Sequence, residues 1–186
     1  MRRGPDWGYF PEPAKSLFIL DTPEQEEAAN QEFAVEGLTL NFVSGSRYLG
    51  AYLGPQAELE AWVKPQVEAW AHRVRVLAKI SQRHPQLAYA GLGILLQSAW
   101  QHLQMTVPGV GTLMGPIEEA LREKFSPSLF GEEEITTDFR KNLGHSVKHG
   151  GLGIPDPQLS AECAYNPSKA ASRELVDSLL GGSVLN

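Results

Sequence analysis

The sequence has one cysteine, Cys163, and no long apolar run. A single cysteine excludes an intramolecular disulfide, and with scattered histidines it excludes a cysteine-rich zinc site. No segment reaches the roughly 20 apolar residues that a membrane-spanning helix needs. No apolar stretch follows Met1-Arg2-Arg3, as one would in a secretory signal. We therefore expect an intracellular protein, cytoplasmic or nuclear, that does not enter a membrane.

Common catalytic motifs are also lacking. The chain has no G-x-x-x-x-G-K-[ST] phosphate loop and no G-x-S-x-G nucleophile elbow. Its aspartates are scattered and none is adjacent to another: Asp6, Asp21, Asp138, Asp156 and Asp177. A two-metal polymerase or nuclease needs converging carboxylates to hold its cations. The residues therefore predict no cofactor for this chain.

The composition is that of a folded protein. A hydrophobic fraction of 42% over 186 residues suits one domain, or one domain with an added lobe. The net charge of −6 disfavours nucleic-acid binding unless the basic residues are concentrated on one face. The acidic residues do cluster where helices are expected to begin, for example Glu24 to Glu27 and Glu132 to Glu134.

The first third of the chain has a β-α-β-β pattern. An apolar run at Ser16–Leu20 predicts a buried strand, and Thr22-Pro23-Glu24-Gln25 begins a helix that ends at Gly37. Alternation over Leu38–Phe42 predicts a second strand. The run Arg47–Leu53 is interpreted as its hairpin partner, with Gly50 at a bulge or a close backbone approach.

The rest of the chain has helical periodicity. The first helix carries an apolar stripe from Leu59 to Leu77, and Pro65 is expected to kink or split it. Further helices are predicted from Pro85, apolar on most sides and central, and from Pro116. Another surrounds Ile135 and Phe139 and ends at Gly144, and a last pair begins near Pro157 and Ser168 and ends at Gly181-Gly182.

We therefore predict an α+β fold, a small sheet of about three strands packed by one helix and followed by a mostly helical, thumb-like lobe. The expected parts are residues 1–54, 55–144 and 145–186. The last part begins with a loop over Gly150–Pro155.

A basic stripe lies near the end of the first long helix. His72, Arg75, Lys79 and Arg83 fall on one side, opposite the apolar stripe of Trp70, Val74 and Leu77. A helix that follows a phosphate backbone needs such a stripe. An ordinary solvated helix face is the alternative, and Glu68 interrupts the same side.

Other single residues have weaker interpretations. Lys15 precedes a predicted strand and suits a proton donor or phosphate contact, although flanking surface lysines are commoner. His145 and His149 have a metal-compatible spacing but no evident third ligand. Cys163 is expected to be a small core residue of an amphipathic helix.

Four of these segments, in this order, resemble the C-terminal half of reverse transcriptases of non-LTR-type retroelements. They are Gly8-Tyr9 with Lys15-Ser16, then Arg47-Tyr48-Leu49-Gly50, then a helical region that includes Pro85–Leu92, and then Gly150-Gly151-Leu152-Gly153-Ile154. Val147 stands where that family's last segment would have a proline. The resemblance spans nearly the whole chain.

The resemblance implies a fragment of an RNA-directed DNA polymerase. Lys15 would be the palm lysine near the incoming triphosphate. Arg47, Tyr48, Leu49 and Gly50 would be the primer-grip hairpin, and the helices would be the thumb that binds the primer–template duplex. The metal-binding aspartates, with their Mg²⁺, and the fingers and palm core would precede Met1.

Two other classes remain open from the residues alone. The first is a non-catalytic α+β module whose acidic surface binds protein. The second is a small nucleic-acid-binding domain unrelated to polymerases.

The lack of converging carboxylates leads to a first prediction. The purified chain should extend no primer with Mg²⁺ or Mn²⁺, which a primer-extension assay against a no-enzyme control would measure. Extension above that control would contradict the prediction.

Overall fold

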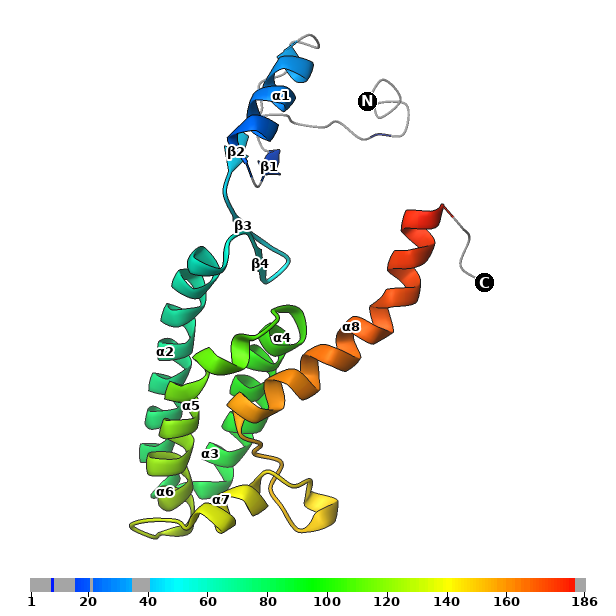
Figure 1. Cartoon of the computed structure of the whole chain (residues 1–186). Helices are drawn as coiled ribbons and strands as arrows, with labels where there is room; N and C mark the ends of the chain where they lie inside the picture. The colour runs from blue at the N-terminus through cyan, green and yellow to red at the C-terminus, as the bar shows by residue number, and fades with distance from the viewer. Residues whose placement is uncertain (1–7, 9–15, 21, 35–40, 183–186) are drawn as a thin grey trace. The chain divides into compact units, whose positions relative to one another are not determined.

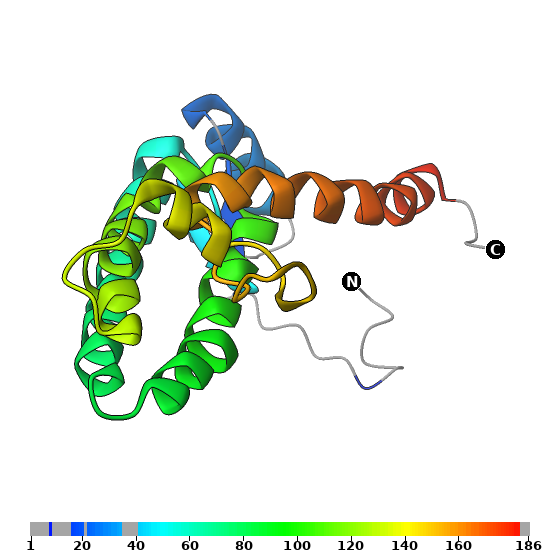
Figure 2. The ribbon, with the colours of Figure 1, turned by 90° about the horizontal axis from the view of Figure 1, so that it is seen from below.

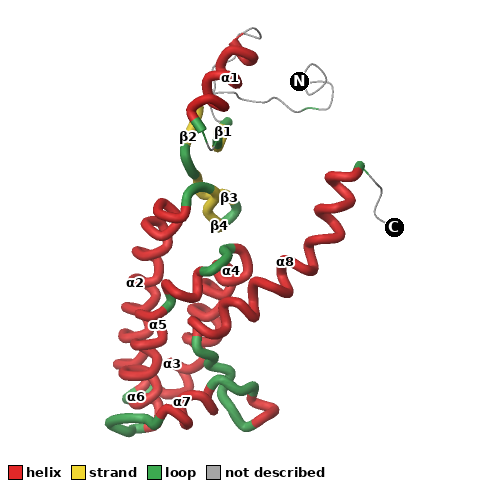
Figure 3. The backbone as a smooth tube through the Cα atoms, in the orientation of Figure 1, coloured by secondary structure: helices red, strands yellow, loops and turns green. Residues whose placement is uncertain are grey.

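The computed structural model describes Gly8 and residues 16–20, 22–34 and 41–182. The chain divides into two compact units, Met1–Leu59 and Glu60–Asn186. Among the described residues, strands occur only in the first unit, and the second is helical (Figure 3). The predicted α+β fold, with a small β part followed by a mostly helical part, is confirmed.

The first unit begins with a β-α-β arrangement. It contains β1 (Leu17–Ile19), α1 (Pro23–Ala34) and β2 (Asn41–Val43), and β1 pairs with β2 in parallel. Phe18 lies between Phe33 of α1 and Phe42 of β2, at ring-centroid distances of 5.6 and 6.0 Å. These aromatic contacts hold the helix on the two-stranded sheet. β1 is only half-buried, because Leu17 is exposed.

The hairpin was assigned the wrong partner. Ser46–Tyr48 (β3) pairs with Ala51–Leu53 (β4) in a second two-stranded sheet, instead of Arg47–Leu53 pairing with the preceding strand. Leu49 and Gly50 form the two-residue turn, with φ of 48° and 85°. Positive φ at both central residues is typical of a type I′ turn, which closes a hairpin locally. Gly50 is therefore a turn residue, not a bulge. Of the strand predicted at Leu38–Phe42, residues 38–40 lie outside the described residues.

The second unit is built from helices that pack side by side (Figures 1 and 2). Its elements are α2 (Gln56–Ser81), which begins in the first unit, α3 (Pro85–Gly91), π-helix η3 (Leu92–Gln97), α4 (Ser98–Thr106), 3₁₀-helix η4 (Val110–Leu113), α5 (Gly115–Ala120), π-helix η5 (Leu121–Phe125), α6 (Ser126–Phe130), α7 (Thr137–Leu143), 3₁₀-helix η6 (Val147–His149) and α8 (Pro157–Gly181). No described helix combines the length and the apolar character needed to cross a membrane.

Apolar side chains from several helices form the core of this unit. The most deeply buried are Val63, Val67 and Val74 of α2, Leu92 of η3, Ile117 of α5, and Leu121 and Phe125 of η5. The predicted apolar stripes of α2 and of the helix from Pro116 are therefore the buried faces.

Two helices continue through a proline at which the sequence predicts a kink, a split or a boundary. α2 runs through Pro65 and α8 runs through Pro167, so the predicted pair of helices after Pro157 is one helix. A proline deprives the carbonyl four residues earlier of its helical donor. Here those carbonyls belong to Ala61 and Cys163, which lie at solvent-exposed positions, so that water can serve as the donor. Cys163 is exposed rather than a core residue.

The helix from Pro85 has one exposed apolar side. Leu92 and Leu96 are buried, but Leu87, Ile94 and Leu95 are 65–73% exposed. The expectation of a central helix, apolar on most sides, is therefore wrong. The π-helix η3 lies within this stretch, and one residue more per turn rotates the side chains that follow it.

The loop between α7 and α8 is held by side chains of other helices. Tyr89 Oη donates to the carbonyl of Leu152 at 2.6 Å, Gln97 Nε2 to that of Gly153 at 2.9 Å, and Arg140 to that of Ile154 at 2.7 Å. Gln104 Nε2 donates to the carbonyl of Pro157, the first residue of α8, at 2.6 Å. Buried carbonyls need such partners when no regular ladder supplies them.

The backbone geometry of this loop accounts for its glycines. A Cβ on Gly151 would collide with the backbone carbonyls of His145 and Asn142, so any other residue would displace the backbone. Gly153 has a φ of 65°, a conformation that suits glycine. The Gly150–Ile154 segment is thus fixed by the packing of the loop.

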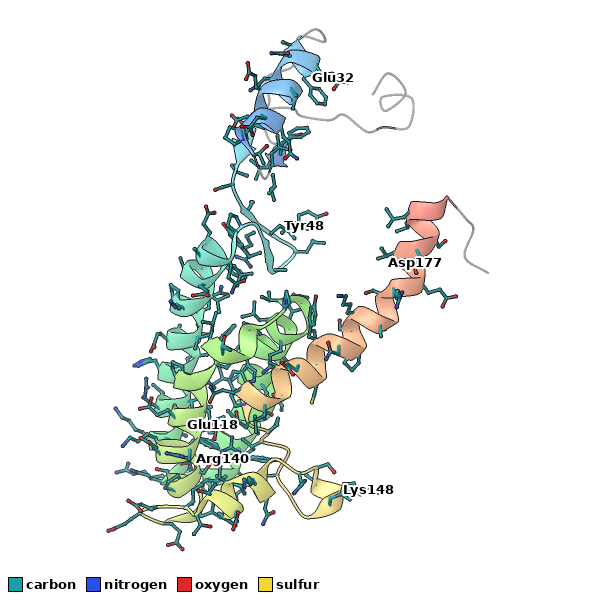
Figure 4. All side chains as sticks on the ribbon, in the orientation of Figure 1. Glu32, Tyr48, Glu118, Arg140, Lys148 and Asp177 are labelled. Carbon is teal, nitrogen blue, oxygen red and sulfur yellow. The ribbon has the colours of Figure 1, made fainter. Side chains whose placement is uncertain are left out.

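A buried ion pair connects this loop to α5. Arg140 of α7 donates to Glu118 of α5 through Nε at 2.9 Å and also through Nη2 (Figure 4). Their side chains are only 6% and 13% exposed. Burial raises the pKa of the Glu118 carboxyl against the opposing hydrogen bonds from Arg140. The ion pair therefore does not fully offset the cost of desolvation.

Loss of the arginine should be costly. In Arg140→Met the Glu118 carboxylate and the carbonyl of Ile154 lose buried donors, so the free energy of unfolding should fall by about 3–5 kcal/mol. Urea denaturation followed by tryptophan fluorescence measures it, because Trp70 and Trp100 are buried in this unit. The control is Arg122→Met, an arginine whose side chain is 54% exposed and which contacts Glu123 at 3.5 Å. It should cost less than about 0.5 kcal/mol. Equal losses in the two variants would contradict the prediction.

Candidate nucleic-acid interface

The basic stripe lies on the exposed side of α2. His72 and Lys79 are exposed and Arg75 is half-buried, while Val67 and Val74 on the opposite side are buried. Arg83 is exposed in the turn after the helix, where its N–H donates to the carbonyl of Ile80 at 3.1 Å. The structure thus places His72, Arg75 and Lys79 along one edge of α2, and Arg83 is exposed beyond the end of that helix.

A groove of about 440 Å³ runs beside this stripe. His72, Arg75 and Lys79 line one side, and Lys124 and Ser128 from η5 and α6 line it as well. Lys124 is a further cation that sequence reasoning missed. Its place in the groove depends on how η5 packs against α2, and no spacing along the chain indicates that.

Acidic residues line the same groove. Glu123 comes from η5, and Glu132 and Glu133 come from the loop before α7. Within the described residues, neither Arg75 nor Lys79 has a carboxylate within 4 Å. The glutamates therefore lower the positive potential of the groove without neutralising a particular cation. The prediction that Glu132–Glu134 would begin a helix is wrong, because α7 begins at Thr137 with Thr136 as its N-cap.

The hairpin presents a second group of predicted residues. Arg47, Tyr48 and Leu49 are exposed, with Tyr48 at 62% and Leu49 at 80% (Figure 4). Leu49 is the one non-glycine residue with positive φ in the described part of the chain. Such a conformation costs on the order of 1 kcal/mol. The hairpin tip therefore combines exposed apolar surface with backbone strain.

Glu58 fixes the base of this hairpin. Its carboxylate accepts hydrogen bonds from Tyr52 Oη and Ser44 Oγ, each at 2.7 Å. The bond from Tyr52, together with that from Ser44, lowers the pKa of Glu58, and the same contact with Glu58 raises the pKa of Tyr52. The hairpin is thereby attached to the first turns of α2 by a charge-assisted pair of hydrogen bonds.

The remaining candidates are not supported as a site. Lys15 lies outside the described residues. His149 Nδ1 lies 2.9 Å from Ser146 Oγ in η6. Across residues 16–20, 22–34 and 41–182, no three His, Cys, Asp or Glu residues are grouped so as to hold a metal ion.

The structure therefore groups the predicted residues in two sets. Arg47, Tyr48, Leu49 and Gly50 share one hairpin in the first unit. The stripe of His72, Arg75, Lys79 and Arg83 belongs to the second unit, together with Lys124. Compared with known proteins, the chain matches no family model, no curated protein and no solved structure.

The groove glutamates should oppose polyanion binding. Replacing Glu132 and Glu133 by glutamine removes two negative charges that share the groove with Arg75 and Lys79. Each charge at a solvated distance near 8 Å is worth about 0.5 kcal/mol, so affinity for a nucleic-acid duplex should rise about fivefold. Fluorescence anisotropy at low salt would measure this.

A matched control has the same net charge as the Glu132 and Glu133 double variant. Glu24→Gln with Glu27→Gln removes two exposed carboxylates of α1, in the other unit, and should change affinity by less than about twofold. If both pairs raise affinity equally, net charge and not the groove determines binding.

Proposed function

We propose that this chain is the duplex-binding part of a retroelement-type RNA-directed DNA polymerase. The observation that carries the proposal is the row of cations along α2, which borders a groove and lies opposite a buried face. The residues give no catalytic step of their own. The chain would hold nucleic acid for chemistry carried out by a polymerase core that supplies the carboxylates.

The stripe has dimensions that suit a phosphate backbone. From His72 to Lys79 the helix rises by about 11 Å, and Arg83 follows in the turn after the helix. Phosphates of one strand follow one another at about 3.4 Å along the axis of a duplex, so several lie within reach. Phosphate contacts carry no sequence information, so binding would be independent of sequence. The negative net charge and the groove glutamates would keep it weak.

The hairpin supplies a second contact in this proposal. Tyr48 and Leu49 offer exposed apolar surface on a two-residue turn, and Arg47 adds a cation beside it. Aromatic and apolar side chains of this kind pack against bases or sugars at the end of a strand. This would be the primer-positioning hairpin. Lys15 would contact the incoming triphosphate. Mg²⁺ would be bound by the carboxylates of the polymerase core.

A charge reversal tests the proposal. The triple variant Arg75→Glu, Lys79→Glu and Arg83→Glu should lose duplex binding by tenfold or more, since it replaces attraction by repulsion. The slope of the logarithm of the binding constant against the logarithm of the salt concentration should also become less negative by about 2 to 3, because about three phosphate contacts are lost. Filter binding of an RNA–DNA hybrid over a salt series measures both quantities.

The control variant reverses the same number of charges elsewhere. Lys141, Lys148 and Lys169 are exposed lysines outside α2, and their reversal to glutamate gives the same net charge. Their triple variant should keep most of the binding and the salt slope. If the two triple variants lose binding equally, the attraction is diffuse and the stripe is a solvated face. If the unmodified chain binds no duplex at low salt, the proposal is wrong and a protein-interaction module becomes the better hypothesis.

A further inference from the structure

The second half of α8 carries exposed apolar side chains. Among the described residues, the buried side chains of α8 are those of Pro157 and Ala161, in its first turns. Beyond them Leu175, Val176, Leu179 and Leu180 are 45–83% exposed. This half of the helix extends away from the other helices of the unit in both ribbon views (Figures 1 and 2). Leu175, Val176, Leu179 and Leu180 together form the α8 apolar face.

The α8 apolar face continues the face that the helix already buries. Leu179 follows Ala161 by 18 residues, which is five full turns, and so lies on the same side. Ala161 packs close to Gly111 of η4: a Cβ added to Gly111 would lie 3.1 Å from the Cβ of Ala161. The side of α8 that packs on the helical unit at Ala161 therefore continues as exposed apolar side chains in the second half of the helix.

An extended helical half with such a face requires a partner to be stable. Isolated helices shorter than about 12–15 residues are marginal in water, because their stability comes mainly from packing an apolar face. Leu175 with Leu179, and Val176 with Leu180, are pairs four residues apart, as in helices that pack against a second helix.

The charges beside this face are arranged for a second copy of the same helix. Lys169 and Arg173 come first along the chain, and Glu174 and Asp177 follow. Arg173 Nε lies 3.8 Å from Asp177 Oδ2 in the same helix, and these side chains are 82% and 69% exposed. Figure 4 shows Asp177 on the extended half. In an antiparallel pair centred on Leu175, Arg173 of each copy faces Asp177 of the other.

We propose that the chain forms a homodimer in which two α8 helices pack antiparallel through the α8 apolar face. Twofold symmetry brings the same side of each helix together, so basic residues of one copy meet acidic residues of its partner. A parallel pair would place the Arg173 edges of the two helices on opposite sides of the contact, so the pairing of Arg173 with Asp177 between copies would not form. Two helices of this length bury a modest area, so the dimer would dissociate in the micromolar range. This proposal is independent of nucleic-acid binding.

The oligomeric state of the whole chain tests the proposal. Analytical ultracentrifugation over about 1–100 µM should show a concentration-dependent monomer–dimer equilibrium. Leu175→Asp with Leu179→Asp should raise the dissociation constant at least tenfold, because it places charges in the apolar contact. The control Leu87→Asp with Ile94→Asp changes two exposed apolar residues of α3 and η3 and should leave it unchanged. Circular dichroism of each variant verifies that the helical unit is folded.

Mixing charge variants tests the antiparallel arrangement. Arg173→Asp alone and Asp177→Arg alone should each weaken the dimer, since each sets like charges against each other across the pair. A mixture of the two variants should dimerise again, because opposite charges then face each other between copies. A chain that stays monomeric at 100 µM would overturn the proposal, as would a dimer that the Leu175 and Leu179 changes leave intact. A mixture no tighter than either variant alone would overturn the charge pairing.

Discussion

The helical unit depends on hydrogen bonds to the loop between α7 and α8. This loop and the start of α8 have no regular ladder for their carbonyls, so the donors come from four elements: α3 (Tyr89), η3 (Gln97), α4 (Gln104) and α7 (Arg140). Arg140 also holds Glu118, which ties α5 to the same point. The position of the first turns of α8 on the helical unit is therefore fixed by polar contacts as much as by the burial of Pro157 and Ala161. Such networks are stabilising only when each member has its partner.

The cations of the helical unit differ in whether they have a structural partner. The buried arginine is fully used by Glu118 and by loop carbonyls. The cations of the α2 stripe have no carboxylate within ion-pair distance among the described residues and lie in or near the groove. Cations without a structural partner are the ones available to an external anion. The negative net charge of the chain is thus compatible with a local basic surface.

Local patterns along the sequence were sufficient for the buried faces of α2 and of α5–η5 and for the basic stripe of α2. The three- and four-residue spacing of apolar residues in α2 and in α5–η5 predicts their buried sides, and a basic stripe opposite them follows from the same geometry. The hairpin partner was missed because Leu49-Gly50 lacks the usual asparagine or aspartate of a type I′ turn. Lys124 and the groove glutamates were missed because only tertiary packing brings them to α2. The continuity of α8 depends on the solvent exposure of Pro167, which the sequence does not reveal.

The two π-helical segments have a consequence for the ancestry of this chain. A π-turn accommodates one more residue than an α-turn between the same neighbours, so it is what a single-residue insertion leaves in a helix whose ends are already packed. Leu92–Gln97 and Leu121–Phe125 are both bounded by helical turns with buried residues. A related chain one residue shorter at either place could keep the same core with an uninterrupted α-helix. Comparison of this protein with distant relatives should therefore allow a one-residue gap inside each of these helices, where gaps are ordinarily penalised.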